Sequence, residues 1–336
     1  MAAILLPGVD ANLKIRDVSK AFIFARAEEL SFFTMAPKGS PPESDLFEHL
    51  FKTRLTPTDS AVVDGVDVVD ADLTNNEANK SRIQRRIQKG RVAIGVGDIA
   101  NQVVKEYGIP TNLMTDNMSD GMCLARENME LTCLKDGDSV PDDGTLANKT
   151  RGIANGIRSA NPAGSPDLPL PTAALTPTAS IVTGVSNIAD TTQFSETIFR
   201  TIMRSIATTG YKKGTWDIFC TPATMDALTA FFTQAPSNST SPVILRRFNQ
   251  ASTDTAITFE VMTYQTPAGK VRFHQHYLLP TGVHALIVDM TMVKIRTKLA
   301  PVTYDLPYLG GKRKKIIEYI FGLQDENPQS HGKITT

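Results

Sequence analysis

The stretch Val271-Arg-Phe-His-Gln-His-Tyr-Leu-Leu-Pro280 follows the turn-like segment Tyr264-Gln-Thr-Pro-Ala-Gly269 and precedes the apolar run Ala285-Leu-Ile-Val-Asp289. Short apolar runs bounded by glycine and proline are typical of β-strands joined by turns. We therefore expect the C-terminal part of the chain to form short strands. Their expected ranges are residues 257–265, 270–279, 283–288, 292–298 and 314–322.

Helical patterns lie upstream of these strands. Apolar side chains recur every fourth residue from Phe194 to Ile206, and Gly210 follows, which predicts a helix that ends at this glycine. Residues 216–220 are expected to form a strand, and residues 221–230 a helix with proline at its first position. Because helices come first and strands follow, with few βαβ units, the order favours an α+β fold.

The clearest helix is expected over residues 116–136. Its apolar positions fall at steps of four, three, four and four, which forms one stripe along a helix. A methionine stripe can serve a cofactor or a soft metal, but core packing is the preferred interpretation. Glu127 and Glu130 lie off the stripe. The stripe consists of Met118, Met122, Ala125, Met129 and Cys133.

Residues 43–98 have an unusual charge pattern. The stretch 59–77 carries only acidic charges among β-favouring valines, and the stretch 80–91 carries only basic charges. We expect the two halves to form a long, exposed β-hairpin or loop. The alternative for the basic half is a helix with Ile83 and Ile87 facing inward.

Two other regions, residues 1–42 and 160–192, are not expected to form compact units of their own. Residues 1–42 are expected to form an arm, with a short helix at 21–30 and an extended piece at 31–35 before a cluster of prolines. Residues 160–192 are rich in proline and small polar residues, which predicts a surface excursion or a partly mobile insertion.

Composition excludes several classes of protein. The 336 residues are 41% hydrophobic, so the chain can bury a core. The formal net charge is zero, which argues against a whole-chain electrostatic grip on nucleic acid or membranes. No apolar run approaches the ~18 residues of a membrane span, and no signal peptide is expected. Three cysteines without a CxxC pair argue against disulfides or structural zinc, so we expect synthesis in the cytosol.

A search for catalytic motifs yields nothing specific. Gly95-Val-Gly97 lacks the rest of a dinucleotide-binding fingerprint, and Gly310-Gly-Lys312 lacks the first glycine and the Ser/Thr of a phosphate loop. His274 and His276 have a spacing that zinc can use, with Asp289 as the nearest further ligand, but solvent-facing strand histidines are preferred. We therefore expect no catalytic site, no cofactor and no metal. The cluster Lys312-Arg-Lys-Lys315 is interpreted as a solvated basic patch.

Several segments resemble one family of tailed-bacteriophage major capsid proteins. They share a glycine turn before a strand, an aromatic-Leu-Pro step, an apolar strand ending in Asp, a Gly-Lys segment before Glu-Tyr, and a His-Gly ending. Residues 82–96 are also similar to the return strand of the family's extended loop. The remaining segments are 264–269, 271–280, 285–289, Asn148-Lys-Thr-Arg-Gly-Ile153, Gly310-Gly-Lys-Arg-Lys-Lys-Ile-Ile-Glu-Tyr-Ile320 and Asn327-Pro-Gln-Ser-His-Gly-Lys-Ile334.

The resemblance implies the Hong Kong 97-type capsid fold. Residues 154–192 and 236–256 have no strong counterpart in the family, and Leu309-Gly-Gly-Lys312 replaces its Lys-Thr-Gly-Asp stretch. The implied regions are an N-terminal arm (1–42), an extended loop (43–98), a peripheral domain (99–209) with the spine helix 116–136 and the insertion 154–192, an axial domain (210–300), and a return strand with the C-terminal tail of the peripheral domain (301–336).

The function implied by the resemblance is structural. The chain would be a major capsid protein, forming pentamers and hexamers of itself in an icosahedral head around double-stranded DNA. Scaffolding, portal and decoration proteins would be partners, DNA contact would be weak and non-specific, and the chain would pass from the host cytoplasm into the virion. The alternatives are an encapsulin-like compartment and, from another class, a soluble enzyme with an unrecognised site.

Charge complementarity suggests how neighbouring subunits are held together. The acidic and basic halves of the extended loop nearly cancel, which suits pairing within the loop or onto a neighbour. The alternative is a solvated loop whose charges only keep it soluble. The expected inter-subunit contact residues are Asp64, Asp67, Asp70, Asp72, Lys80, Arg82, Arg85, Arg86, Lys89 and Arg91.

Overall fold

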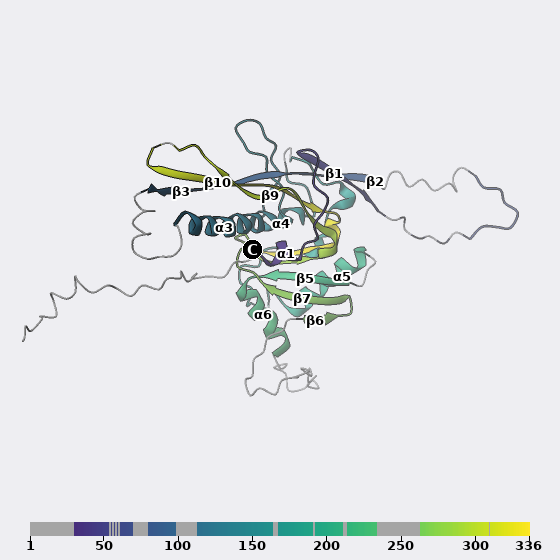
Figure 1. Cartoon of the computed structure of the whole chain (residues 1–336). Coiled ribbons are helices and arrows are strands. Elements are labelled where there is room, and N and C mark those ends of the chain that lie inside the picture. Colours follow the sequence, from purple (N-terminus) through teal and green to yellow (C-terminus); the bar gives the residue numbers. More distant parts are fainter. Residues whose placement is uncertain are drawn as a thin grey trace, which may run out of the picture.

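Two β-sheets and one projecting hairpin organise the chain (Figure 1). A computed structural model describes residues 30–53, 55, 57, 59, 61–69, 80–98, 113–163, 167–190, 192–210, 214–233, 263–308 and 310–336. The described helices are α1 (Ser31–Met35), α3 (Leu113–Leu134), α4 (Ile153–Gly156), α5 (Glu196–Gly210) and α6 (Pro222–Thr233). The described strands are β1 (Leu46–Lys52), β2 (Lys80–Arg86), β3 (Gln88–Gly97), β4 (Ile181–Val182), β5 (Gly214–Cys220), β6 (Thr263–Thr266), β7 (Gly269–Gln275), β8 (Val283–Val288), β9 (Val293–Asp305), β10 (Lys312–Asp325) and β11 (Gly332–Thr335).

The first sheet has three antiparallel strands in the order β3-β10-β9. The long helix α3 lies along this sheet (Figure 1). Ala125, Met129 and Cys133 of the predicted stripe are buried there against Ile317 and Phe321 of β10. The predicted helix at 116–136 is thereby confirmed with bounds shifted by two to three residues, and its stripe from Ala125 to Cys133 is core, while Met118 and Met122 are half-buried.

The second sheet has six strands in the order β4-β11-β8-β5-β7-β6. Helices α5 and α6 pack against it and bury Ile202, Ile206 and Leu228 with Trp216 and Val271 of its strands. Helices α5 and α6 and strands β5 and β8 fall where the sequence pattern placed them, whereas β4 and β11 were not predicted as strands. The mixture of helices and strands in both layers confirms the α+β expectation.

The sheets exchange segments across the expected domain limits. β11, from the tail expected in the peripheral domain, lies between β4 and β8 in the six-stranded sheet, and β4 comes from the expected insertion 154–192. β9 begins at Val293, inside the expected axial domain, but pairs with β10. Apolar burial explains why the C-terminal tail joins the second sheet, because Ile334 of β11 is buried among the core side chains of that sheet. The domain limits themselves remain predictions.

One short segment differs from its expected structure. Residues 31–35 form the helical turn α1, where an extended piece was predicted. The cause is tertiary: the backbone N–H groups of Phe32 and Phe33 donate to the carboxylate of Glu130 at 2.8 and 2.7 Å. A carboxylate that accepts the free N–H groups of a first turn stabilises that turn. The Phe32 ring packs edge-on against Phe219 at 5.3 Å.

Other expectations need correction or lie outside the described residues. The strand expected at 270–279 ends at Gln275, because the chain turns His276 into the core. Residues 1–29 of the N-terminal arm, which include the helix expected at 21–30 except its last residue, lie outside the described residues, as do Asp70, Asp72 and the segment 236–256. Among the described residues, no helix is long and apolar enough to cross a membrane.

Gly152, which precedes α4, tests how tightly α4 is packed. A Cβ at this position would lie 2.0 Å from the backbone oxygen of Lys135, which cannot move without shifting the end of α3. We expect Gly152→Ala to lower the free energy of unfolding by about 1–3 kcal/mol, since overpacking against backbone forces a rearrangement. Gly97→Ala is the matched control, because a Cβ there meets nothing within 4 Å. Chemical denaturation of both variants checks this, and equal stabilities would contradict it.

Candidate functional site: the extended loop, its anchor and a cleft

The extended loop leaves the body from the β1–β2 hairpin. These strands pair antiparallel from Leu46↔Arg86 to Lys52↔Lys80, so the basic half pairs with residues 46–52 and not with the acidic half. The acidic residues lie beyond the strands, and residues 61–69 form no strand and are all exposed. The expected hairpin is therefore present at the loop base, while the charge pairing between its two halves is absent from the described residues.

The hairpin rests on a small apolar cluster. Phe51 of β1 and Ile83 of β2 are buried against Leu170 and Ala174 of the expected insertion. The residues that resembled a surface excursion therefore support the base of the loop. Burial of these side chains fixes the direction in which the hairpin leaves the body.

Arg85 anchors the hairpin in the core of its own subunit. Its side chain is 2% exposed and its Nη2 atom lies 3.5 Å from Oδ2 of Asp325, which is 1% exposed. Asp325 also accepts from Nε2 of His331 at 3.0 Å, while Nδ1 of His331 accepts the backbone N–H of Asp289 at 3.1 Å. His331 thereby carries its proton on Nε2, aimed at the carboxylate.

The anchor keeps Asp325 ionised. Burial alone would raise the pKa of the Asp325 carboxyl, but the interactions with His331 and the charge of Arg85 outweigh it and lower this pKa below the usual value. Burial also lowers the pKa of Arg85 to about 10, so this guanidinium remains charged at neutral pH. The result is a buried ion pair between the loop base and the end of β10.

A second group of charges surrounds this pair. Arg151 donates to Oδ1 of Asp138 at 2.5 Å, and Arg158 lies 3.1 Å from Oδ2 of the same carboxylate. Arg86, next to the anchor, donates to Asp167 through Nε at 2.7 Å. The Arg86–Asp167 ion pair joins the loop base to the segment 138–167, while Arg85 joins it to the end of β10.

The other predicted contact residues divide into those with an ion pair among the described residues and those that are exposed. Lys89 and Arg91 of β3 both reach Glu318 of β10, at 3.0 and 2.7 Å, and exposed Arg82 lies 3.4 Å from Glu48. Asp64, Asp67 and Lys80 are exposed. Contact with a neighbouring subunit therefore remains open to the exposed acids and Lys80, whereas Arg85 and Arg86 are used within the subunit.

Sequence reasoning missed the acids that bind the basic half. Asp167, Glu318 and Asp325 lie far from the loop in sequence, so no local pattern pointed to them. The sequence analysis did quote His331, the partner of Asp325, as part of the His-Gly ending of the chain.

The two strand histidines take separate partners. His274 lies 3.0 Å from Asp217, which also receives Arg272. His276 is fully buried with its Nε2 2.8 Å from Glu130, so the expectation that it faces solvent is wrong. Within the described part of the chain, no group of three or more His, Cys, Asp or Glu side chains could hold a metal.

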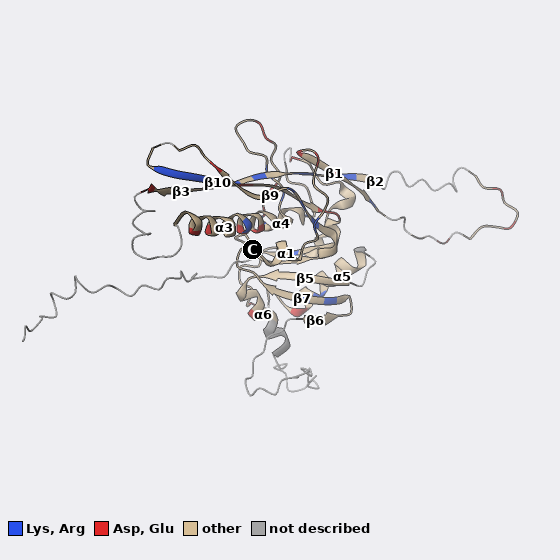
Figure 2. Cartoon of the chain, viewed as in Figure 1, with Lys and Arg blue, Asp and Glu red and all other residues tan. Residues whose placement is uncertain are grey.

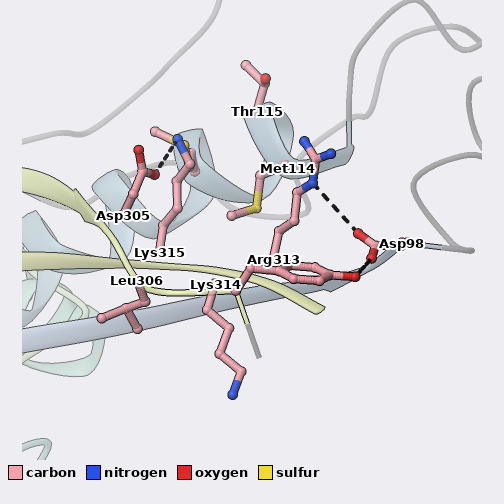
Figure 3. A pocket seen from close by; sticks show the side chains of 10 residues that line it. Asp98, Met114, Thr115, Asp305, Leu306, Arg313, Lys314 and Lys315 are labelled. Atoms are coloured by element: carbon pink, nitrogen blue, oxygen red, sulfur yellow. Dashed lines mark hydrogen bonds and ion pairs between the residues drawn. The ribbon is translucent and has the colours of Figure 1, made fainter. Parts of the chain in front are cut away.

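A cleft lies at the opposite end of the three-stranded sheet from the hairpin. It has a volume of about 630 Å³ and lies between the start of α3 and the tip of the β9–β10 hairpin (Figure 3). Met114 lines it, with Arg313 turned toward Asp98 and Lys315 toward Asp305. Figure 2 shows the blue basic run at the start of β10.

Known structures share this arrangement at low sequence identity. A structure of mycobacterium phage Bobi matches with 12% identity and a TM-score of 0.60 over 99% of both chains. The capsid structure of cyanophage P-SCSP1u matches with 12% identity and a TM-score of 0.61, covering 100% of this chain and 96% of that one. The capsid of a native GTA particle matches with 10% identity and a TM-score of 0.60, covering 100% and 98%. No match was found among curated proteins.

These likenesses establish the fold as the Hong Kong 97-type fold of phage capsid subunits. Residues 7–336 match the family described as SU10 major capsid protein, so the chain belongs to that family. It is a shell-forming major capsid protein of a tailed phage and a component of the virion capsid. The resemblance seen in the sequence is thereby confirmed.

Proposed function

We propose that this subunit assembles into pentamers and hexamers that close an icosahedral head around double-stranded DNA, and that its extended loop holds neighbouring subunits together. The supporting observation is a set of exposed valines on the loop beyond the rigid hairpin. Val62, Val63 and Val68 are 72%, 76% and 77% exposed. Exposed apolar side chains gathered on one segment are typical of a surface that another copy covers.

The further partners follow from the same role. A scaffolding protein guides assembly in the host cytoplasm, and portal and decoration proteins complete the head. Because the formal net charge is zero, contact with packaged DNA is weak, salt-dependent and independent of sequence. The subunit has no catalytic role. The family match does not favour an encapsulin-like compartment or a soluble enzyme.

The loop is tested by replacing residues 61–69 with a glycine-serine segment of equal length. These residues are exposed and form no strand, so the melting temperature of free subunits is expected to stay unchanged. Negative-stain microscopy is expected to show closed shells for the native chain and only free subunits or open fragments for the variant. Normal shells from the variant would show that the loop does not hold subunits together.

A further inference from the structure

Three arginines in the body of the subunit carry buried nitrogen atoms without an acceptor. The side chains of Arg85, Arg151 and Arg158 are 2%, 0% and 8% exposed. Within the described part of the chain, Nε of Arg85, Nη1 of Arg151, and both Nε and Nη2 of Arg158 are buried and have no hydrogen-bond partner. A buried donor that has left water and found no acceptor destabilises the folded chain, and a charged donor does so most. These nitrogens therefore point to a further ligand.

The three guanidinium groups form one cluster. Asp138 accepts from Nε of Arg151 at 2.5 Å and lies 3.1 Å from Nη1 of Arg158, so two of the groups share one carboxylate. Burial lowers the pKa of Arg85, and the nearby charges of Arg151 and Arg158 lower it further. A Cβ on Gly156 would lie 3.6 Å from Nη2 of Arg85, so the segment that carries Arg158 passes beside the Arg85 guanidinium.

Positive charge is in excess in this cluster. Its three guanidinium groups face two carboxylates, those of Asp138 and Asp325. The nearby histidines are neutral: Nδ1 of His331 accepts a backbone N–H, and burial, followed by the charge of Arg85, lowers the pKa of His49. One buried positive charge therefore lacks a counter-charge, which is strongly destabilising unless an anion compensates it.

The other charged side chains around the cluster are already balanced in pairs. Each basic group meets one acid, so none of these acids supplies the missing negative charge. The pairs are Arg86–Asp167 at 2.7 Å, Lys294–Glu326 at 2.7 Å and Lys333–Asp136 at 3.9 Å.

We propose that a small monovalent anion such as chloride binds in this cluster. It accepts hydrogen bonds from the unpartnered nitrogens of Arg151 and Arg158, with the charge of Arg85 beside it. Water also accepts hydrogen bonds but brings no charge, whereas one monovalent anion matches the single excess charge. The side chain of Asp138 is 25% exposed, which gives the ion a route from solvent. The ion ties the base of the hairpin to the segment 138–158, whichever surface the extended loop contacts.

Thermal unfolding of purified subunits tests the site. Potassium chloride is exchanged for potassium gluconate at constant ionic strength and neutral pH, so that screening is equal and only the size of the anion changes. A ligand that binds only the folded state raises stability with the logarithm of its concentration. We expect the melting temperature to rise by about 2 °C for each tenfold increase of chloride above its dissociation constant. Bromide is expected to replace chloride.

Arg158→Gln removes the excess charge and keeps a side chain that can donate to Asp138. The variant is expected to lose the chloride response and to be at least as stable as the native chain in gluconate, which a purely structural role of Arg158 does not predict. Arg204→Gln is the matched control, because it removes one positive charge from an exposed position of α5. It is expected to keep the full chloride response.

Chloride magnetic resonance gives a second readout. Folded native subunits and Arg204→Gln are expected to broaden the chloride signal, and Arg158→Gln is expected to broaden it far less. Equal melting temperatures of the native chain in chloride and gluconate would overturn the proposal, and this measurement does not depend on any variant folding. A chloride response that persists in Arg158→Gln would also overturn it, because the ion would then bind elsewhere.

Discussion

Replacing Arg85 by glutamate is expected to prevent stable folding of the subunit rather than to impair assembly alone. The substitution places a second carboxylate beside Asp325 in a site where both native partners are at most 2% exposed. Breaking a buried ion pair costs about 3–5 kcal/mol because it leaves an uncompensated charge, and reversal adds repulsion. That loss approaches the total stability of many domains. Thermal and urea unfolding of purified subunits measure it.

Arg82→Glu is the matched control for Arg85→Glu. Arg82 lies on the same strand, but its side chain is 71% exposed, and its one ion pair within the described part of the chain is with Glu48. Its reversal is expected to cost less than about 1 kcal/mol, as for other exposed ion pairs. Equal stability of the two variants would show that the hairpin is not anchored through Arg85. A variant that reverses Arg82, Arg85 and Arg86 together therefore cannot test assembly alone, because Arg85 belongs to the core of the subunit.

Glu130→Ala is expected to produce the second large effect. Its fully buried carboxylate accepts from the backbone N–H groups of Phe32 and Phe33 and lies within hydrogen-bond distance of His276. Alanine leaves these buried donors without their acceptor, at a cost of about 3–5 kcal/mol if each loss costs 1–3 kcal/mol and the losses do not fully add. Unfolding should occur at a lower temperature, and limited proteolysis should cut near α1 sooner.

Two variants on the same helix sharpen this test. Glu130→Gln retains one side-chain oxygen and is expected to lose less stability than Glu130→Ala. Asp120→Ala changes an exposed acid of α3 and should leave both stability and proteolysis near α1 unchanged. If Glu130→Ala unfolds like the native chain, the turn of α1 does not depend on the carboxylate.

The comparison of prediction with structure separates local from long-range causes. The helices α3, α5 and α6 and the strands β5 and β8 lie where periodicity and turn residues predicted them, because an amphipathic element carries its own pattern along the chain. The Hong Kong 97-type fold was predicted from the order and spacing of short segments, and known structures share this fold at 10–12% identity. The sequence alone thus determined the class of fold and the function of the family.

The tertiary structure decided which partners the charged side chains have. The sequence shows an acidic run followed by a basic run, and local reasoning pairs them with each other. In the folded chain Arg85 pairs with Asp325, 240 positions away, and residues 31–35 become helical because Glu130 lies beneath them, 98 positions from Phe32. Buried charges and free backbone N–H groups must find partners once water is removed, and packing alone determines which partners are near. No pattern along the chain records that proximity.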